Sequence, residues 1–228
     1  MKAGIVVFPG SNCDYDCYYA LNDLLNISSR FLWHKDSHLY DVDLVILPGG
    51  FSYGDYLRCG MIATLSPIMR SITSFAERGG LVLGICNGFQ ILVESALLPG
   101  AFLRNRDLKF ICDYVYLRVE STLTPFTKNL DGKILSIPIA HKDGNYYVDK
   151  ETLAEMYKNG QVIFKYCDSN GYINGFANPN GSTDNIAGVS NKAGNILGMM
   201  PHPERASEKT LASVDGSYIF NSIKSLLA

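Results

Sequence analysis

The residue of greatest chemical interest is Cys86, in the stretch LVLGICNGFQIL at residues 81–92. A Gly-x-Cys-x-Gly pattern there follows an aliphatic run and precedes apolar positions at helical spacing, namely Phe89, Leu92, Val93 and Ala96. This order predicts a strand, a sharp turn and a helix, the nucleophile-elbow pattern with cysteine in place of serine. The N-terminus of the helix would favour a thiolate, and its free N–H groups could receive a developing oxyanion, as acyl transfer requires.

A buried structural cysteine is the alternative, because glycines at positions 84 and 88 would also let a helix pack closely on a strand. A thiolate nucleophile further needs a general base and a group that orients this base. The segment GMMPHPER at residues 198–205 supplies both as His202 and Glu204. Prolines on both sides of His202 fix the backbone, and residues two apart in an extended chain share a side. Alone, this segment would indicate a rigid surface turn. With Cys86, it indicates a Cys-His-Glu triad.

A third glycine-rich element lies in ILPGGFSYGDYLRCG at residues 46–60. Glycines at the end of a strand would let the backbone N–H of Gly50 or Phe51 face the nucleophile, beside that of Asn87. An ordinary glycine turn is the alternative. The remaining cysteines and histidines show no metal-ligand spacing, so we expect free thiols and no metal site.

The elements that position these residues follow a βαβα rhythm in the first half of the chain, which predicts a mostly parallel sheet. The helix after Ser66 is the clearest, with Ser66 as its cap, Pro67 in the first turn and Gly79 and Gly80 as its end. The second half has three β-forming runs with no helix expected between them, which indicates an antiparallel addition: residues 108–120, 133–141 and 160–167. A helical pattern returns at residues 215–227.

The bulk properties fit one globular domain that spans residues 1–228, because 47% of its residues are hydrophobic. A net charge of −2 without a basic run argues against DNA, RNA or anionic membranes as partners. The apolar run before Pro9 and Gly10 is too short for a signal-peptide core or a membrane span. We therefore expect a cytoplasmic protein.

Five segments together resemble the class I (triad) glutamine amidotransferases, and in particular the glutaminase subunits of phosphoribosylformylglycinamidine synthases. They span nearly the whole chain: PGGFSYGDYLR, GICNGFQIL, LKFIC with YLRVE, ANPNGS and GMMPHPER. The resemblance implies an open, flavodoxin-like α/β sheet with helices on both faces and the nucleophile at the carboxyl ends of the strands.

The resemblance also implies a role for each candidate residue. Cys86 would attack the carboxamide of L-glutamine to form a glutamyl thioester. His202 would protonate the departing ammonia and then activate water, and Glu204 would orient His202. The oxyanion hole would comprise Gly50, Phe51 and Asn87, and Gln90 would line the glutamine pocket.

A division of labour follows from the same resemblance. The chain lacks a GxxxxGK[ST] loop for ATP, so it would release ammonia but not install it. A large synthase subunit, with ATP and magnesium, would convert formylglycinamide ribonucleotide to its amidine, with the help of a small bridging subunit. No cofactor is expected in this chain. One departure from the family is Lys142-Asp143, where Gly-Glu is common. Two alternatives are a stand-alone cysteine hydrolase and a noncatalytic regulatory subunit.

Overall fold

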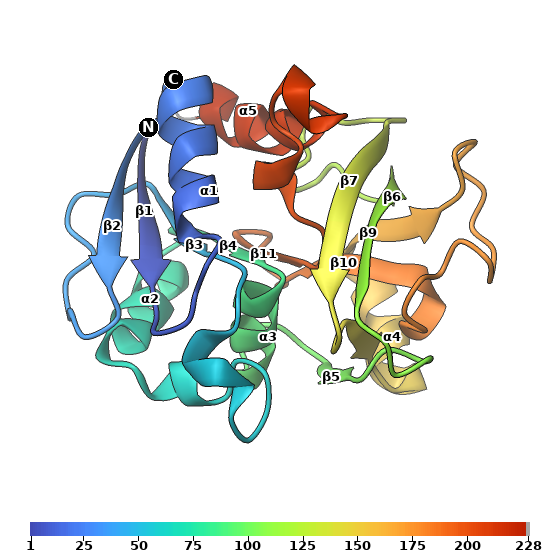
Figure 1. Ribbon diagram of the computed structural model, residues 1–228, viewed down its shortest axis with the longest axis horizontal. Helices are drawn as coiled ribbons and strands as arrows, with labels where there is room; N and C mark the ends of the chain where they lie inside the picture. Colours follow the sequence, from blue (N-terminus) through green and yellow to red (C-terminus); the bar gives the residue numbers. More distant parts are fainter. Residues whose placement is uncertain (227–228) are drawn as a thin grey trace.

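A nine-stranded mixed sheet forms the centre of the computed structural model, which describes residues 1–226 (Figure 1). Its strand order is β2-β1-β3-β4-β11-β10-β9-β6-β7. The bounds are β1 (Lys2–Val7), β2 (Ser28–Trp33), β3 (Leu44–Leu47), β4 (Leu81–Ile85), β6 (Ile111–Val119), β7 (Ile134–His141), β9 (Val162–Cys167), β10 (Ile186–Ser190) and β11 (Ile196–Met199). Two short strands, β5 (Ala101–Leu103) and β8 (Asn145–Tyr147), pair separately.

The sheet has a parallel half and an antiparallel half. Strands β2, β1, β3, β4 and β11 pair in parallel, whereas β10, β9, β6 and β7 continue the sheet in antiparallel pairs. This arrangement confirms the predicted α/β class with an antiparallel addition. The addition is continuous with the parallel half, so both share one hydrophobic core.

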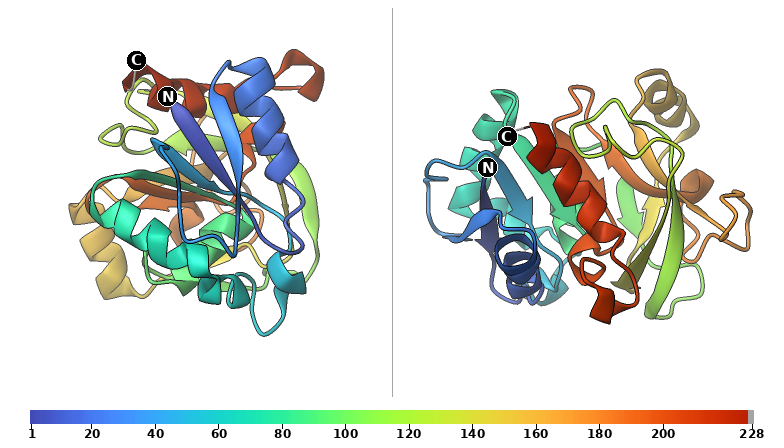
Figure 2. Two further views of the ribbon diagram at one scale, coloured as in Figure 1. Left: turned by 90° about the vertical axis from the view of Figure 1, so that its left-hand side faces the viewer. Right: turned by 90° about the horizontal axis from the view of Figure 1, so that it is seen from above.

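Helices cover both faces of the sheet, as predicted (Figure 2). On one face lie α1 (Asp14–Tyr18), which continues as a π-helical turn, and α5 (Gly216–Leu226); on the other lie α2 (Pro67–Glu77) and α3 (Asn87–Glu94). The predicted last helix extended to residue 227, which lies outside the described residues. Within residues 1–226, no helix is both long and apolar enough for a membrane crossing.

Three local features differ from the sequence-based expectation. Ser66 occupies the N-cap position of α2, but its hydroxyl makes no capping hydrogen bond and instead lies 3.0 Å from the Tyr53 hydroxyl. Helix α4 (Lys150–Lys158) interrupts the second half, where no helix was expected. Its sequence signal is Asp149, whose carboxylate accepts two backbone N–H bonds of 2.9 Å in the first turn. The hairpin β10–β11 is also absent from the sequence-based expectation.

Helix α3 approaches the sheet closely because two glycines leave room for it. A Cβ atom at Gly88 would lie 1.9 Å from the backbone oxygen of Leu47 in β3. One at Gly84 would lie 2.5 Å from a methyl carbon of Leu92. These contacts fix the start of α3 against the ends of β3 and β4.

We expect Gly88→Ala to lower the free energy of unfolding by about 3 kcal/mol, because backbone atoms must move to admit the methyl group. Urea denaturation monitored by circular dichroism measures the effect. The matched control is Gly175→Ala in an exposed turn, where a Cβ would meet nothing within 4 Å. Equal midpoints for the two variants would contradict this account of how α3 packs.

Candidate active site

Three predicted elements converge at one edge of the sheet. Strands β3, β4 and β11 are parallel neighbours, so their carboxyl ends lie together. The chain passes from β3 to Gly49 and Gly50, from β4 to Cys86, and from β11 to His202. Segments more than 100 residues apart in sequence therefore supply one site.

Cys86 occupies the strained turn that the elbow pattern predicts. Its φ and ψ angles are 50° and −104°, and helix α3 begins at the next residue. A non-glycine residue adopts this conformation only at a cost of about 1–3 kcal/mol, which the surrounding structure must offset. The side chain is 5% exposed, and its Sγ lies 3.7 Å from the backbone oxygen of Ala140. Cys86 therefore lies against the end of β7, and any substrate needs a local opening to reach its sulfur.

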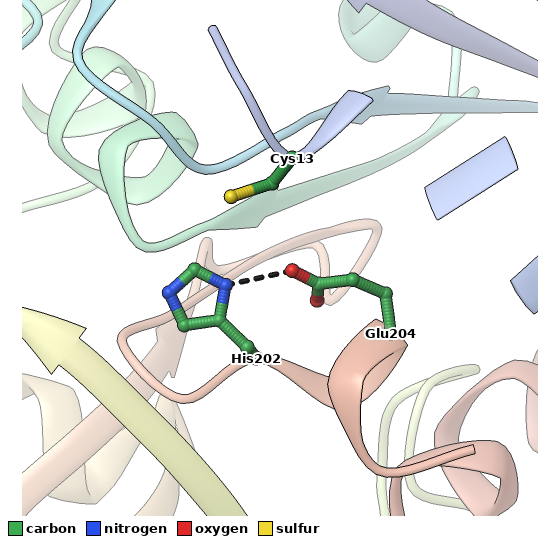
Figure 3. A group of neighbouring side chains, drawn as sticks. All are labelled: Cys13, His202 and Glu204. Atoms are coloured by element: carbon green, nitrogen blue, oxygen red, sulfur yellow. Dashed lines mark hydrogen bonds and ion pairs between the residues drawn. The ribbon is translucent and has the colours of Figure 1, made fainter. Parts of the chain in front are cut away.

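His202, whose pKa responds to the nearby Cys86 sulfur, forms a buried pair with Glu204. Figure 3 shows the two side chains facing each other. The Nδ1 atom of His202 lies 2.7 Å from Oε1 of Glu204, and their side chains are 2% and 0% exposed. A 3-10 turn at Pro203–Arg205, rather than the expected extended chain, brings them together. Among residues 1–226, Nε2 of His202 has no hydrogen-bond partner. This nitrogen is the one available for proton transfer.

The electrostatic surroundings favour a protonated His202. Burial alone lowers the pKa of this imidazole, but the Glu204 carboxylate and the Cys86 sulfur outweigh burial and raise the pKa well above its usual value. An imidazolium beside a cysteine stabilises the nucleophilic thiolate. The geometry thus suits a mechanism in which Cys86 is the nucleophile and His202 acts first as an acid and later as a base.

Cys13 is a neighbour that the sequence analysis did not single out. Its ligating atom and those of His202 and Glu204 all lie within 4.8 Å of one another (Figure 3). Burial raises the pKa of the Cys13 thiol, and Arg205 donates a hydrogen bond to its sulfur at 3.1 Å. A neutral thiol beside a guanidinium does not favour a divalent cation. Gly49 makes this packing possible, because a Cβ there would lie 2.6 Å from His202 Cε1.

The expected oxyanion donors differ in their availability. The backbone N–H of Phe51 donates to the oxygen of Gly10 at 3.1 Å, so it does not face the nucleophile in this structure. Within residues 1–226, the N–H groups of Gly50 and Asn87 have no acceptor. Gly50 has a φ of +130°, a conformation that favours glycine. In this structure the N–H groups of Gly50 and Asn87 are therefore available as donors, whereas the N–H of Phe51 is already engaged.

Asn87 and Gln90 connect α3 to two loops. Asn87 Oδ1 accepts the N–H of Ser52 at 3.1 Å, and its Nδ2 donates to Gln90 Oε1 at 2.9 Å. Gln90 Nε2 then donates to the backbone oxygen of Asp143 at 2.7 Å. Both polar ends of Gln90 thus have protein partners. Because this contact uses the backbone of Asp143, the Lys142-Asp143 departure leaves it intact.

Comparisons with known proteins agree with this geometry. The CobB/CobQ-like glutamine amidotransferase domain matches residues 1–220. The chain belongs to this family. It is 54% identical to phosphoribosylformylglycinamidine synthase subunit PurQ of Acaryochloris marina, over 100% of this chain and 98% of that protein. It is also 54% identical to the PurQ subunit of Moorella thermoacetica, over 98% of this chain and 95% of that protein.

Solved structures support the same assignment. A chain from the structure of PurLQS from Thermotoga maritima superposes with a TM-score of 0.87 and 44% identity, covering 100% of this chain and 99% of that chain. Another glutamine amidotransferase from Thermotoga maritima shares the fold alone, with a TM-score of 0.56, 17% identity, and coverage of 100% of this chain and 86% of that chain. The resemblance predicted from the sequence is confirmed, and the protein is a glutamine amidotransferase of the PurQ group.

Proposed function

We propose that Cys86 hydrolyses L-glutamine through a thioester, and that the chain delivers the ammonia to a separate synthase subunit. The acceptor would be formylglycinamide ribonucleotide, in the purine-pathway reaction of phosphoribosylformylglycinamidine synthase. The strained Cys86 turn beside the buried His202–Glu204 pair carries this proposal. The similarity to PurQ subunits over the full chain supports the choice of acceptor.

The first half of the reaction forms a thioester. The Cys86 thiolate attacks the carboxamide carbon of glutamine, and the resulting oxyanion accepts hydrogen bonds from the N–H groups of Gly50 and Asn87. As the tetrahedral intermediate collapses, Nε2 of His202 donates its proton to the departing nitrogen, and ammonia leaves. Glu204 keeps Nδ1 protonated and stabilises the imidazolium.

The second half of the reaction restores the enzyme. Neutral His202 takes a proton from water, whose oxygen attacks the thioester carbon. Collapse of this second intermediate breaks the carbon–sulfur bond, so glutamate leaves and the thiolate–imidazolium pair returns. The new carboxyl group releases its proton to solvent, so each turnover consumes one glutamine and one water and yields one glutamate, one ammonia and one proton.

Two partner proteins belong to the proposal: a small bridging subunit, and a large synthase subunit that binds ATP and magnesium. This chain itself needs no cofactor, and its location would be cytoplasmic, which fractionation of the producing cells tests. A stand-alone hydrolase would turn over glutamine or peptides without a partner, whereas a noncatalytic subunit would not need Cys86.

The decisive experiment is covalent labelling with a glutamine analogue that carries a diazoketone in place of the carboxamide. We expect selective modification of Cys86 in the presence of the synthase partner, blocked by excess glutamine, with the other cysteines unmodified. Intact mass and peptide mapping measure the sites. A nonspecific alkylator and Cys86→Ala serve as controls.

Labelling of Cys86 by the alkylator but not by the analogue, in the complex as well as in the isolated chain, would reject glutamine as substrate. Labelling only in the complex would show that the partner opens the site, which agrees with the 5% exposure of Cys86.

A further inference from the structure

The turn at residues 141–144 continues β7 beyond Ala140, whose oxygen lies 3.7 Å from the Cys86 sulfur. Every backbone carbonyl of this turn accepts a hydrogen bond from outside it. The pairs are His141 O with Asn105 Nδ2 (2.9 Å), Lys142 O with Asn105 N (2.8 Å), Asp143 O with Gln90 Nε2 (2.7 Å) and Gly144 O with Asn180 Nδ2 (2.8 Å). These four hydrogen bonds therefore hold the turn in place close to Cys86.

His141, in this turn, has an acceptor atom without a partner among the described residues, its Nε2. The amide of Asn105 is oriented by its two donations to the oxygens of Lys109 and His141, so its Oδ1 is an acceptor. That oxygen lies 3.1 Å from Nδ1 of His141, which must therefore carry the proton. Burial, together with the charge of His202, lowers the pKa of His141 to about 4, so the ring is neutral at pH 7. Its Nε2 lone pair is buried and has no partner within residues 1–226.

Tyr166 presents the complementary donor. Asn180 accepts the N–H of Ser182 at its Oδ1, so its Nδ2 is the donor to Gly144 O at 2.8 Å and to the Tyr166 hydroxyl oxygen at 3.3 Å. The hydroxyl proton of Tyr166 has no acceptor in the described part of the chain. Burial is the main cause that raises the pKa of Tyr166, and the Cys86 sulfur adds to it. The phenol therefore remains protonated near the nucleophile.

Both free groups lie around Gly144. The His141 ring packs against it, since a Cβ at Gly144 would lie 2.3 Å from the ring, and Asn180 bridges Gly144 and Tyr166. A neutral donor and a neutral acceptor suit a small neutral molecule that both donates and accepts hydrogen bonds. Ammonium cannot accept the Tyr166 proton, and a carboxylate cannot donate to His141. Ammonia and water both have the required chemistry.

We propose that Tyr166 and His141 form a hydrogen-bonding site that receives the ammonia released at Cys86. The inference rests on the proposed function. Ammonia held by two neutral groups stays unprotonated, as its attack on an acceptor in a partner subunit requires. Neither group can supply a proton readily, because the phenol and the Nδ1–H of a neutral imidazole are both weak acids. The site would thus retain the nucleophilic form of the product.

The test uses the complex reconstituted with its synthase partner, supplied with glutamine. Glutamate, amidine product and ammonia in bulk solution are measured together. We expect Tyr166→Phe to raise the ratio of leaked to delivered ammonia about five-fold, as the loss of one buried hydrogen bond predicts. His141→Asn, which keeps an N–H donor toward Asn105 but removes the Nε2 acceptor, should raise the ratio similarly. Added ammonium salt should restore product formation in both variants.

Tyr172→Phe and His38→Asn, at exposed positions, are the matched controls and should leave the ratio unchanged. Tyr166→Phe keeps its ring and leaves Asn180 bonded to Gly144, so loss of folding does not confuse the result. If glutamate release and amidine formation decrease equally in the two variants, with no leaked ammonia, the inference is overturned. Tyr166 and His141 would then bind water or glutamine instead of ammonia. Failure of the wild-type complex to release glutamate would instead reject the proposed function.

Discussion

Replacement of Cys86 by alanine should reduce glutamine-dependent amidine synthesis about 10⁶-fold, to the level of the uncatalysed background. No other group at the Cys86 turn can form the thioester, and His202 cannot activate a methyl group. Ammonia-dependent synthesis by the same complex should persist, because its chemistry belongs to the synthase subunit. Product formation with glutamine and with ammonium salt, measured in parallel, separates the two activities.

Cys112→Ala is the matched control, because Cys112 is an exposed thiol on β6. This substitution should leave both activities unchanged. Full glutamine-dependent activity in Cys86→Ala would exclude the thioester mechanism and support a noncatalytic subunit. Loss of both activities would indicate that the variant fails to assemble, which gel filtration of the complex detects.

The proposed triad could be inferred from the sequence because its members carry local signals. Glycines flank Cys86, prolines flank His202, and Glu204 follows His202 at two positions. Each signal reflects a backbone requirement that neighbouring residues satisfy, so it is visible without the fold. The order of strands and helices in the first half was predictable for the same reason, since apolar periodicity is local.

The remaining features depend on contacts between distant segments. Arg205 reaches the Cys13 sulfur across 192 positions of sequence, and no spacing rule reports such a pair. The hydrogen bond from the Phe51 N–H to the oxygen of Gly10, 41 residues earlier, has no local signal in the sequence either. By contrast, α4 carried a local signal in Asp149 and the spacing of Leu153 and Met156, which the β-forming character of the flanking segments obscured.

Glu204→Gln should lower kcat about 10⁴-fold, the magnitude typical of removing the charge that orients a catalytic histidine. The amide can still approach Nδ1 of His202, so the packing of the buried pair is preserved, but it no longer stabilises the imidazolium. In the variant, burial still lowers the pKa of His202, but the Glu204 charge that raised this pKa is gone. Any residual activity then depends on a histidine that is less readily protonated.

The pH profile distinguishes this role from a structural one. In the wild type, Glu204 helps to raise the pKa of His202, so the imidazolium that would protonate the departing nitrogen in the proposed mechanism persists to higher pH. Activity should therefore fall on the alkaline side only as pH passes through this raised pKa. In Glu204→Gln the alkaline limb of kcat should move to lower pH. Glu155→Gln, in an exposed ion pair with Lys192, should leave the profile unchanged. A Glu204→Gln enzyme that loses activity without any shift of this limb would show that Glu204 supports the fold of the loop rather than the charge of His202.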